Sequence, residues 1–354
     1  MIKYLGSKRL LVPVLGRIAE AVGARTAVDL FTGTTRVAQE FKRRGIEVTA
    51  TDSASYSEVL SDCFIATDAK EIDELALGIE LDRLNALPGT PGYVTKTFCT
   101  ESRYFQPHNG ARIDAIRDAI EADHPSGPWR PILLTALLLA ADRVDSTTGL
   151  QMAYLKQWSA RSHRDLKLRL PELIPGPGHT VRGDAVQTVE LLDPVNLMYL
   201  DPPYNQHRYF TNYHVWETLV AWDAPEHYGV ACKRVDARDD ATKSVFNRRR
   251  LMPDALRRAI AAVRARVVVV SYNDESWVAI DELEAMIEAR GGAVSTFAFD
   301  SRRYVGAQIG IHNPRGERVG TVSHVRNQEY VVIAGARDEV RRLAEVTREV
   351  AVGA

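Results

Sequence analysis

Cysteine is scarce in this sequence, and its few cysteines lie far apart. The chain has three cysteines in 354 residues, Cys63, Cys99 and Cys232, and no C-x-x-C pair. Zinc sites and disulfide frameworks need cysteine or histidine at short, regular spacing. The sequence therefore predicts neither a metal site nor disulfide bonds, and the reducing cytoplasm is the expected location.

Long apolar runs and an excess of charge of one sign are missing as well. No run approaches the ~20 apolar residues that a membrane-spanning helix needs. Lys3, Lys8 and Arg9 interrupt the N-terminus, where a signal peptide would be apolar. The formal net charge is −1. Any contact with nucleic acid must therefore come from a local basic surface and not from the total charge.

Glycine is sparse where a dinucleotide-binding loop would need it. Only Gly33 lies in the turn after the first predicted strand, so the fingerprint G-x-G-x-x-G is absent. This absence disfavours a nicotinamide-dependent dehydrogenase. The sequence also contains no internal repeat and no low-complexity tail.

What remains is the composition of an ordinary globular protein, with 45% hydrophobic and 26% charged residues. A chain of this length can bury a substantial core, as one large domain or as two. Strand patterns alternate with helical ones, which is typical of an α/β fold with a mostly parallel sheet. Residues 294–299 and 330–334 are predicted as strands on either side of a Gly/Arg-rich excursion, and they indicate an antiparallel edge.

The first predicted strand is followed at once by a turn of small residues and a helix. Gly33 in this turn lets the backbone approach a ligand closely, and the N-terminus of the helix adds its dipole. Residues 46–50 are the next predicted strand, and Asp52 follows about 20 residues beyond the glycine. Such an acid can accept hydrogen bonds from both hydroxyls of a ribose, and a strand-terminal acid that caps the next helix is the alternative. Asp184 follows a third predicted strand.

In the stretch 196–205 an apolar run ends in an acid, two prolines and an aromatic residue. Residues 197–200 are predicted as a short buried strand, and the two prolines stop it because each fixes φ and lacks an N–H. Asp201 therefore stands at the carboxyl end of a strand, where open α/β sheets bind their ligands. With the following carbonyls and the ring of Tyr204, it could hold a planar group that bears an amino nitrogen. A strand that simply ends at a proline-rich turn is the alternative.

The N-terminus puts Gly6-Ser7-Lys8 directly before a helical pattern. Ser7 could cap this helix and leave N–H groups that face an anion. A capped surface helix with two solvated cations explains the same residues.

Aromatic and basic side chains gather in three further segments, 141–169, 205–222 and 233–250. A solvated face is the default explanation of a charge run. Mixed with hydroxyls and aromatics, such runs also suit a surface that contacts phosphates and stacks on bases. The candidates for DNA contacts are Arg143, Thr147, Lys156, Arg161, Arg164, Asn205, Arg208, Tyr209, Asn212, Tyr213, His214, Lys243, Arg248 and Arg249. The histidines among these segments show no spacing that suits a metal.

Together and in this order, the motifs resemble the N6-adenine DNA methyltransferases of the Dam-like (D12, α-group) class. The resemblance is closest to the methylases of type II restriction–modification systems. It is carried by residues 4–9, 29–34, 52, 183–184 and 201–205, and it continues in 141–156, 209–217 and 271–273. Asp201-Pro202-Pro203-Tyr204 alone is a moderately specific motif, whereas all of these motifs in order are strongly specific.

The resemblance implies a class I S-adenosylmethionine (SAM)-dependent methyltransferase fold. Residues 1–89 and 178–354 would form the SAM-binding catalytic domain, and residues 90–177 a mostly helical target-recognition insertion. Within the cofactor site, Asp52 would hold the ribose hydroxyls and Asp184 the adenine amino group. The full set of implied cofactor contacts is Tyr4, Leu5, Gly6, Ser7, Lys8, Asp29, Phe31, Thr32, Gly33, Thr34, Thr35, Asp52, Asp184, Ala185 and Asp201.

The implied reaction is a direct in-line transfer of the SAM methyl group to N6 of an adenine in double-stranded DNA. The catalytic residues would be Asp201, Pro202, Pro203 and Tyr204. Asp201 and the Pro202 carbonyl would accept the two N–H bonds of the amino group, so that its lone pair faces the methyl-sulfonium. Tyr204 would stack on a base that has rotated out of the duplex.

Several rival hypotheses remain open at this point. The acceptor could be an RNA adenine, cytosine N4 or a protein side-chain amide, or the chain could be a catalytically silent DNA-binding protein of the same fold. Asp201 favours adenine, and the insertion with the basic segment 233–250 favours duplex DNA. Association with the nucleoid through DNA and a cognate restriction endonuclease that acts on the same site are further expectations, with no membrane and no metal involved.

Overall fold

The structure is a computed structural model that describes residues 2–4, 8, 10–204, 206, 208–302, 311–312, 318–320 and 326–353. Four of the predicted contacts lie outside the described residues. They are Leu5, Gly6 and Ser7 of the cofactor set and Asn205 of the DNA set.

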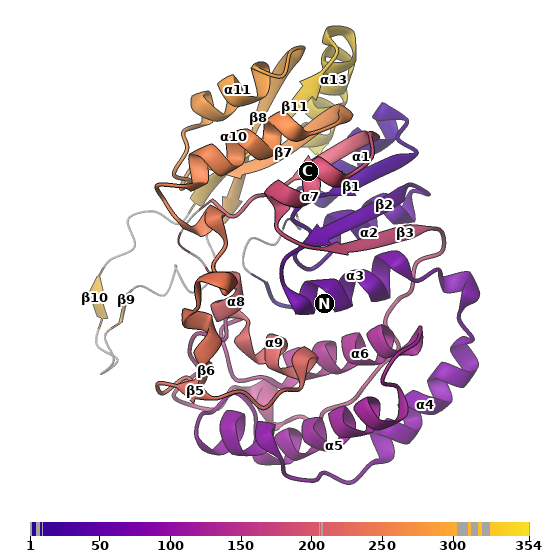
Figure 1. The fold of residues 1–354 in the computed structure, drawn as a ribbon, viewed down its shortest axis with the longest axis vertical. Coiled ribbons are helices and arrows are strands. Elements are labelled where there is room, and N and C mark those ends of the chain that lie inside the picture. Colours follow the sequence, from indigo (N-terminus) through magenta and orange to yellow (C-terminus); the bar gives the residue numbers. More distant parts are fainter. Residues whose placement is uncertain are drawn as a thin grey trace.

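A seven-stranded sheet forms the centre of the molecule (Figure 1). Its strands are β1 (Thr26–Asp29), β2 (Glu47–Asp52), β3 (Gly178–Arg182), β4 (Val195–Leu200), β7 (Ala265–Asn273), β8 (Ala293–Arg302) and β11 (Arg326–Gly335). Their order is β3-β2-β1-β4-β7-β11-β8. The first five strands in this order, β3, β2, β1, β4 and β7, run parallel, and β11 runs antiparallel to both of its neighbours. The predicted α/β fold with a mostly parallel sheet and an antiparallel edge is confirmed.

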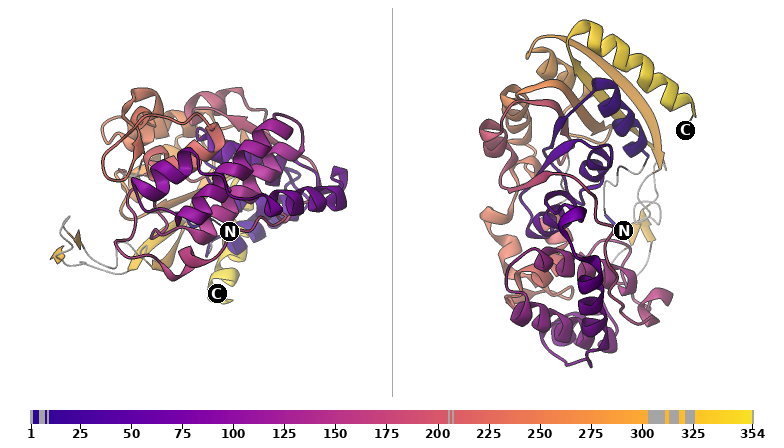
Figure 2. Two further views of the ribbon diagram at one scale, coloured as in Figure 1. Left: turned by 90° about the horizontal axis from the view of Figure 1, so that it is seen from below. Right: turned by 90° about the vertical axis from the view of Figure 1, so that its right-hand side faces the viewer.

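Helices cover both faces of this sheet. On β4, Leu197 and Tyr199 pack with one face's helices, whereas Met198 and Leu200 pack with the other's. Because both faces are buried, β4 reads as a continuous apolar run and not as an alternating one. The first layer consists of α1 (Val12–Val22), α2 (Arg36–Arg43) and α13 (Arg337–Gly353), and α13 lies beside α1 (Figure 2). The second layer consists of α7 (Ala185–Leu191), α10 (Met252–Ala262) and α11 (Ile280–Glu288).

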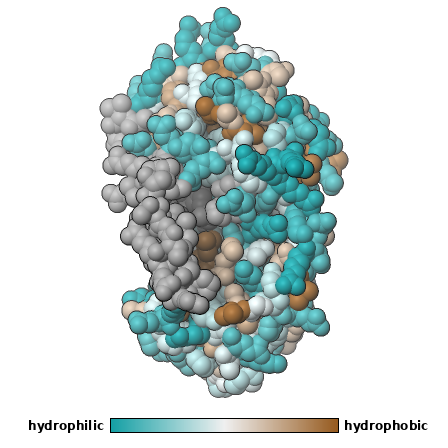
Figure 3. Space-filling view, turned by 90° about the vertical axis from the view of Figure 1, so that its left-hand side faces the viewer, coloured by the Kyte–Doolittle hydropathy of each residue, from teal (hydrophilic) through white to brown (hydrophobic). Residues whose placement is uncertain are grey.

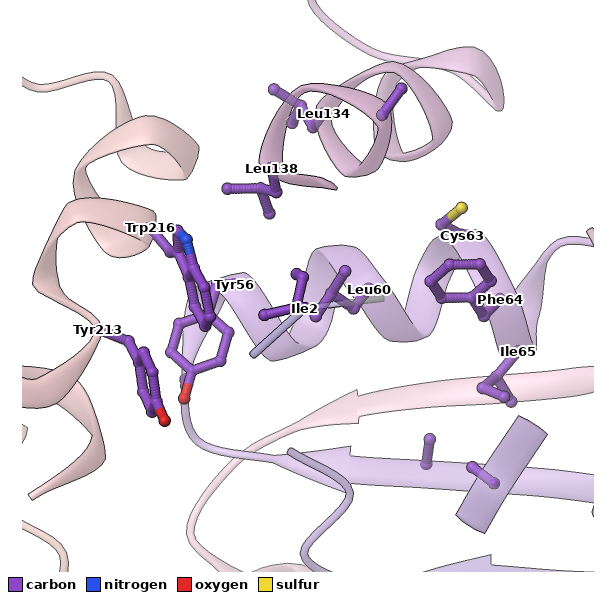
Figure 4. Close-up of a cluster of buried hydrophobic side chains, with 14 of the residues drawn as sticks. Ile2, Tyr56, Leu60, Cys63, Phe64, Ile65, Leu134, Leu138, Tyr213 and Trp216 are labelled. Atoms are coloured by element: carbon purple, nitrogen blue, oxygen red, sulfur yellow. The ribbon is translucent and has the colours of Figure 1, made fainter. Parts of the chain in front are cut away.

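A further group of helices lies between β2 and β3 in the sequence. The helix α3 (Ser55–Ser61) continues into the π-helix η1 (Asp62–Ala66) and lies between the sheet and α6 (Trp129–Val144) (Figure 4). Tyr56 and Leu60 of α3 belong to the same buried cluster as Leu138 of α6. The end of the molecule opposite α11 and α13 is helical (Figures 1 and 2). It holds α4 (Glu74–Ala86), α5 (Pro107–Asp123) and α6 (Trp129–Val144), with the short η2 (Ala69–Glu71), η3 (Thr95–Thr100) and η4 (Ala160–His163).

A second chain segment joins these helices. It contains α8 (Tyr209–Asn212), α9 (His214–Ala221) and the hairpin of β5 (His227–Tyr228) and β6 (Lys233–Arg234). The Arg117 guanidinium donates to the carbonyl of Leu219 at 2.7 Å, and the Tyr93 hydroxyl donates to the carbonyl of Pro225 at 2.7 Å. The helical end is therefore built from two parts of the sequence, and the division at residues 90–177 stays a prediction.

The remaining elements are short. The basic segment contains three single 3-10 turns, η5 (Val235–Arg238), η6 (Asp240–Thr242) and η7 (Val245–Asn247). Within the excursion between β8 and β11, β9 (Ile311–His312) pairs with β10 (Arg318–Gly320). None of the helices that the structure describes combines the length and the apolar character that a membrane span would need.

Candidate active site

A cavity of about 560 Å³ lies at the carboxyl ends of the parallel strands. Asp29, Asp52 and Asp201 reach it from the ends of β1, β2 and β4, and Asp184 follows β3. The predicted residues that line it are Tyr4, Lys8, Asp29, Phe31, Thr32, Gly33, Thr34, Asp52, Asp184, Ala185, Asp201, Pro202, Pro203, Tyr204, Tyr209 and Lys243. Parallel strands bring residues that are far apart in the sequence to one crevice.

Asp29 is the most deeply buried acid of the cavity, at 1% exposure. Its Oδ2 accepts hydrogen bonds from the Thr32 hydroxyl at 3.0 Å and from the Ala38 N–H at 3.2 Å. Its Oδ1 is buried and has no hydrogen-bond partner among the described residues. Burial raises the pKa of this carboxyl to about 7 against the effect of the Thr32 hydrogen bond. The site therefore lacks a donor, which a positively charged or N–H-bearing ligand would supply.

The turn after β1 requires glycine at position 33 for two reasons. Its φ is +52°, in the left-handed region that favours glycine. A Cβ atom there would also approach the ring of Tyr4 to 3.1 Å. The Gly33 N–H donates to Asp52 Oδ2 at 2.9 Å, and its carbonyl accepts from the Ser57 hydroxyl at 2.7 Å. The turn is therefore fixed before any ligand binds.

Asp52 and Asp184 both hold the first turn of the following helix. Asp52 Oδ1 accepts from the Ala54 N–H at 3.0 Å, and Asp184 Oδ1 accepts from the Val186 and Gln187 N–H groups at 3.0 and 3.3 Å. The capping explanation of these acids is thus correct for local structure. Each carboxylate still has lone pairs toward the cavity, because a carboxylate can accept about four hydrogen bonds. Capping therefore fixes the orientation of these acids, both of which line the cavity.

Asp201 forms a network with Lys8 and Ser271. Its Oδ1 lies 3.0 Å from Lys8 Nζ and accepts from the Ser271 hydroxyl at 3.0 Å. The Tyr199 hydroxyl lies 2.6 Å from that of Ser271, and Glu329 Oε2 lies 3.5 Å from Lys8 Nζ. Among the described residues, all hydrogen bonds and ion pairs of Asp201 fall on Oδ1. Neither the contact with Lys8 nor that with Ser271 uses its second oxygen, Oδ2.

Burial and ion pairing act in opposite directions on this network. Burial raises the pKa of Asp201, whereas the ammonium of Lys8 and the Ser271 hydroxyl oppose the rise. Burial alone would lower the pKa of Lys8, but Asp201, Tyr204 and Glu329 outweigh it and raise that pKa well above its usual value. Lys8 therefore remains an ammonium at 4% exposure.

Residues of β7 and of the segment that follows it contact the turn after β4. The carbonyl of Tyr204 accepts from the Trp277 N–H at 3.2 Å, and its ring meets that of Tyr272 edge-on with centroids 5.7 Å apart. Lys8 Nζ lies 5.7 Å from the centroid of the Tyr204 ring. Three mutually packed rings continue this aromatic wall: the centroid of Tyr4 lies 5.3 Å from Tyr209 and 4.8 Å from Tyr213, and those two are 6.3 Å apart.

Residues 241–247 form a wall of the cavity that the sequence had indicated only as part of a phosphate-binding segment. Phe246 is 1% exposed, and its ring meets that of Phe31 edge-on at 5.1 Å. The signal that was missed is a single aromatic residue inside a basic segment. Ser271 and Glu329 were also missed, because they meet Asp201 and Lys8 only through the sheet order.

The predicted DNA-contacting cations fall into two groups. Lys156, Arg164, Arg208 and Arg249 are exposed. Arg143, Arg161, Lys243 and Arg248 are partly buried. Of this second group, Lys243 and Arg248 both pair with Asp240 Oδ1, at 3.0 and 3.1 Å. Arg161 donates to the carbonyls of Asp145 at 2.8 Å and Thr147 at 2.6 Å, and it pairs with the Asp145 carboxylate.

Four predicted DNA contacts have buried side chains in this structure, and their contact with DNA stays a prediction. Thr147, Asn212, Tyr213 and His214 are 2%, 1%, 0% and 0% exposed. The Thr147 hydroxyl donates to Asp145 at 2.7 Å, and Nε2 of His214 lies 2.8 Å from the carbonyl of Gln151. Burial lowers the pKa of His214 to about 3, so its neutral ring must donate from Nε2. Hydrogen-bonding potential alone had not shown which polar residues face inward.

Thr35, from the predicted cofactor set, lies behind the cavity lining. It is fully buried, and it does not line the cavity. Its hydroxyl donates to the Thr34 carbonyl at 2.7 Å, and its φ of +62° ends the turn before α2. Thr35 therefore shapes the turn, and its contact with a cofactor stays a prediction.

Comparison with known proteins identifies the family. Residues 4–286 match the family model described as D12 class N6 adenine-specific DNA methyltransferase. The chain belongs to this family. The resemblance that the motifs showed and the enzyme class that they predicted are thereby confirmed, and membership implies a methyl donor.

Individual members of the family are similar over most of this chain. The type II methyltransferase M.NlaIII of Neisseria lactamica is 28% identical over 310 residues, which are 81% of this chain and 88% of that protein. M.CviAII of Paramecium bursaria Chlorella virus 1 is 28% identical over 82% of this chain and 89% of its own length. M.FokI of Planomicrobium okeanokoites is 28% identical over 82% of this chain but only 47% of its own length. The chain thus spans about half the length of M.FokI.

Proposed function

We propose that this D12 family member transfers the methyl group of SAM to N6 of an adenine at a specific site in double-stranded DNA. The observation that carries the proposal is the arrangement of acids around one cavity. Asp29, Asp52 and Asp184 follow β1, β2 and β3, and Asp201 follows β4 and opens the Pro-Pro-Tyr turn. One end of the cavity can hold a cofactor while the other holds the acceptor.

The residues at the first end fit SAM. The unpartnered Oδ1 of Asp29 calls for a donor, and the methionine part of SAM carries an ammonium group. Asp52, oriented by Gly33 and Ala54, can accept from ribose hydroxyls. Asp184, oriented by the start of α7, can accept from the adenine amino group. SAM supplies an electrophilic methyl group on a sulfonium.

The second end fits an adenine amino group. Its nitrogen is a poor nucleophile because the lone pair is delocalised into the ring. Asp201 Oδ2 and the Pro202 carbonyl can accept its two hydrogens, which favours a pyramidal nitrogen with its lone pair toward the methyl group. Positioning and electrostatics then supply the rate, and no covalent nucleophile is required.

Lys8 and Ser271 position Asp201 for this role. Both hold Oδ1, at 3.0 Å each, so that the carboxylate cannot rotate freely. Lys8 also opposes the rise in the pKa of Asp201 that burial causes, because an ammonium nearby favours the charged form. Glu329 in turn holds Lys8 from β11.

Adenine can reach this cavity only outside the duplex, because the amino group is inaccessible while the base is stacked and paired. The half-buried ring of Tyr204 offers a stacking surface beside Asp201. The face of the molecule on the side of α8 and β5–β6 is mostly hydrophilic (Figure 3). Exposed Arg208 and Arg249 can contact phosphates there. We propose in addition a cytoplasmic enzyme that acts beside a restriction endonuclease of the same site, as the type II relatives suggest.

The experiment that tests the proposal is transfer of a tritiated methyl group from SAM to plasmid DNA, followed by nucleoside analysis. The expected product is N6-methyl-2′-deoxyadenosine from duplex DNA, with sequencing of modified adenines to give the site. If the label is found in cytosine, only in RNA or in protein, the acceptor is not the DNA adenine that we propose. No label in any acceptor, with SAM bound, would indicate a silent DNA-binding protein.

A further inference from the structure

Three potential metal ligands meet outside the active site, at the helical end of the molecule. They are Glu101, His227 and Cys232, and their ligand atoms all lie within 4.8 Å of one another. Nε2 of His227 lies 2.9 Å from Oε2 of Glu101. Carboxylate, imidazole and thiolate are the three ligand types that Zn²⁺ takes in proteins. The methyl-transfer proposal uses none of these residues.

The separation of the ligand atoms suits a shared ion. Zinc lies about 2.0 Å from nitrogen and oxygen ligands and about 2.3 Å from sulfur, so tetrahedral neighbours are roughly 3.5 Å apart. The three atoms, which all lie within 4.8 Å of one another, are close to that spacing. Three protein ligands would leave the fourth position to water.

The fold fixes the three residues from two distant chain segments. Glu101 ends η3, where its N–H donates to the carbonyl of Lys96 at 3.0 Å. His227 lies on β5, and its pairing with Arg234 closes the hairpin that carries Cys232. Cys232 has a φ of +46°, which is rare for a residue other than glycine, and its N–H donates to the carbonyl of Gly229 at 3.0 Å. The backbone thus holds the thiol inward, beside the other two ligands.

The cluster of Glu101, His227 and Cys232 can be reached from solvent, and contacts with other residues do not occupy all of its ligand atoms. The side chains of His227 and Glu101 are 27% and 36% exposed, whereas Cys232 is 3% exposed. An ion can therefore enter from the solvent side and reach the buried thiol. Lys96 Nζ lies 3.9 Å from Oε1 of Glu101, which leaves Oε2 on the cluster side.

We propose that Glu101, His227 and Cys232 bind one Zn²⁺ ion, with water as the fourth ligand. The ion would tie the β5–β6 hairpin to the end of η3 and so fix the chain that enters the basic segment 233–250. Its binding releases the thiol proton of Cys232. The inference is independent of methyl transfer, because the cluster lies outside the cavity that the strand-end acids line. Sequence spacing could not show the site, since its ligands become neighbours only in the fold.

The test is titration of the full-length, metal-stripped protein with Co²⁺ and then with Zn²⁺. We expect one Co²⁺ per chain with a near-ultraviolet sulfur-to-cobalt charge-transfer band, and displacement of that ion by Zn²⁺. Cys232→Ser and His227→Gln should each weaken binding by at least about 100-fold, because even residues that only orient a ligand contribute about 10- to 100-fold. Cys99→Ser is the matched control, since Cys99 is a buried thiol in the adjoining η3.

Two outcomes would overturn the proposal. One is the absence of a charge-transfer band in the folded wild-type protein, which would leave only the ion pair of Glu101 and His227. The other is an equal loss of binding in Cys99→Ser and Cys232→Ser. If Cys232→Ser does not fold, His227→Gln provides the same readout at a partly exposed position. Transfer of methyl groups by the wild type with and without Zn²⁺ is measured separately, so that the two proposals fail independently.

Discussion

Two sets of charged residues, the acids at the strand ends and the predicted DNA-contacting cations, are held by the structure in different ways. The acids at the strand ends are fixed by backbone N–H groups, as Asp52 is by Gly33 and Ala54. The cations beyond the pocket are either exposed, as Arg208 is, or paired with acids of this chain, as Arg161 is with Asp145. The strand-end acids are therefore held in place before a ligand binds. The exposed cations still have conformational freedom, which they would lose on binding phosphates.

This difference indicates where affinity and rate come from. A ligand that meets fixed acceptors loses less conformational entropy when it binds. Exposed cations contribute through attraction to phosphates, which salt screens. Substitutions in the pocket should thus change rate or cofactor affinity at any ionic strength, and substitutions of the exposed cations should change the salt dependence of DNA binding.

The largest effect is expected at the acceptor end of the pocket. Asp201→Ala removes the oxygen that would accept from the adenine amino group, and we expect the single-turnover rate of methyl transfer to fall by about 1,000-fold or more, equivalent to about 4 kcal/mol. A variant that keeps the rate within about tenfold of the wild type, or ~1.4 kcal/mol, would exclude Asp201 from the reaction.

Lys8→Met should reduce the transfer rate near neutral pH by about 10- to 100-fold, the range of one hydrogen bond to a charged group. Burial raises the pKa of Asp201 and Lys8 opposes this, so the pKa rises further when the ammonium is lost. The carboxylate is then protonated at a higher pH, and the acid limb of the pH–rate profile must move to higher pH.

The control for this shift is Lys3→Met, whose ammonium pairs with Asp145 at 2.9 Å and does not line the cavity. Its acid limb should coincide with that of the wild type. Equal shifts in both variants would mean that the change is a general effect of removing one positive charge.

Arg208→Ala and Arg161→Ala separate the two classes of cation. We expect Arg208→Ala to reduce the slope of log K against log salt for DNA by about 0.9, the value for one phosphate contact. Arg161→Ala should leave that slope unchanged and should lower the free energy of unfolding by about 1–3 kcal/mol, because it strands buried acceptors. Salt-dependent DNA titrations and denaturant melts check these outcomes, and a reversed pattern would break the distinction.

The smallest effect is expected at His214, whose pKa of about 3 lies below the ordinary value of 6.5. As the pH falls below 6.5, the unfolded chain binds a proton that the folded chain does not, so stability is lost by up to about 1.4 kcal/mol per pH unit. His214→Gln should lack this part of the acid slope and should bind DNA as the wild type does. An unchanged slope in the variant would assign the acid sensitivity to other groups.

The sheet and the strand-end acids could be predicted because their signals are local. A short apolar run, a turn and an acid occur together at Asp29, Asp52 and Asp201. The order of these motifs then indicated the family. Parallel pairing brings such strand ends to one edge, so the sequence also indicated which acids meet.

Other parts of the site depend on tertiary packing and could not be read from the chain. Glu329 and Ser271 reach Lys8 and Asp201 only because β11 and β7 lie beside β4 in the sheet order. His214 and Thr147 are typical of a polar surface by residue type, yet they are buried and satisfy carbonyl or carboxylate partners. Burial of a polar residue is decided by its partners, and residue type does not reveal them.

The central claim is that the acids divide between two ligands, with Asp52 serving the cofactor and Asp201 the adenine. The most direct test is the dissociation constant of SAM for Asp52→Ala and Asp201→Ala, measured side by side in the absence of DNA. We predict that SAM binding weakens by about 10- to 100-fold in Asp52→Ala, as for loss of a hydrogen bond to a charged group, and changes by less than about threefold in Asp201→Ala. Equal weakening in both variants would contradict the division.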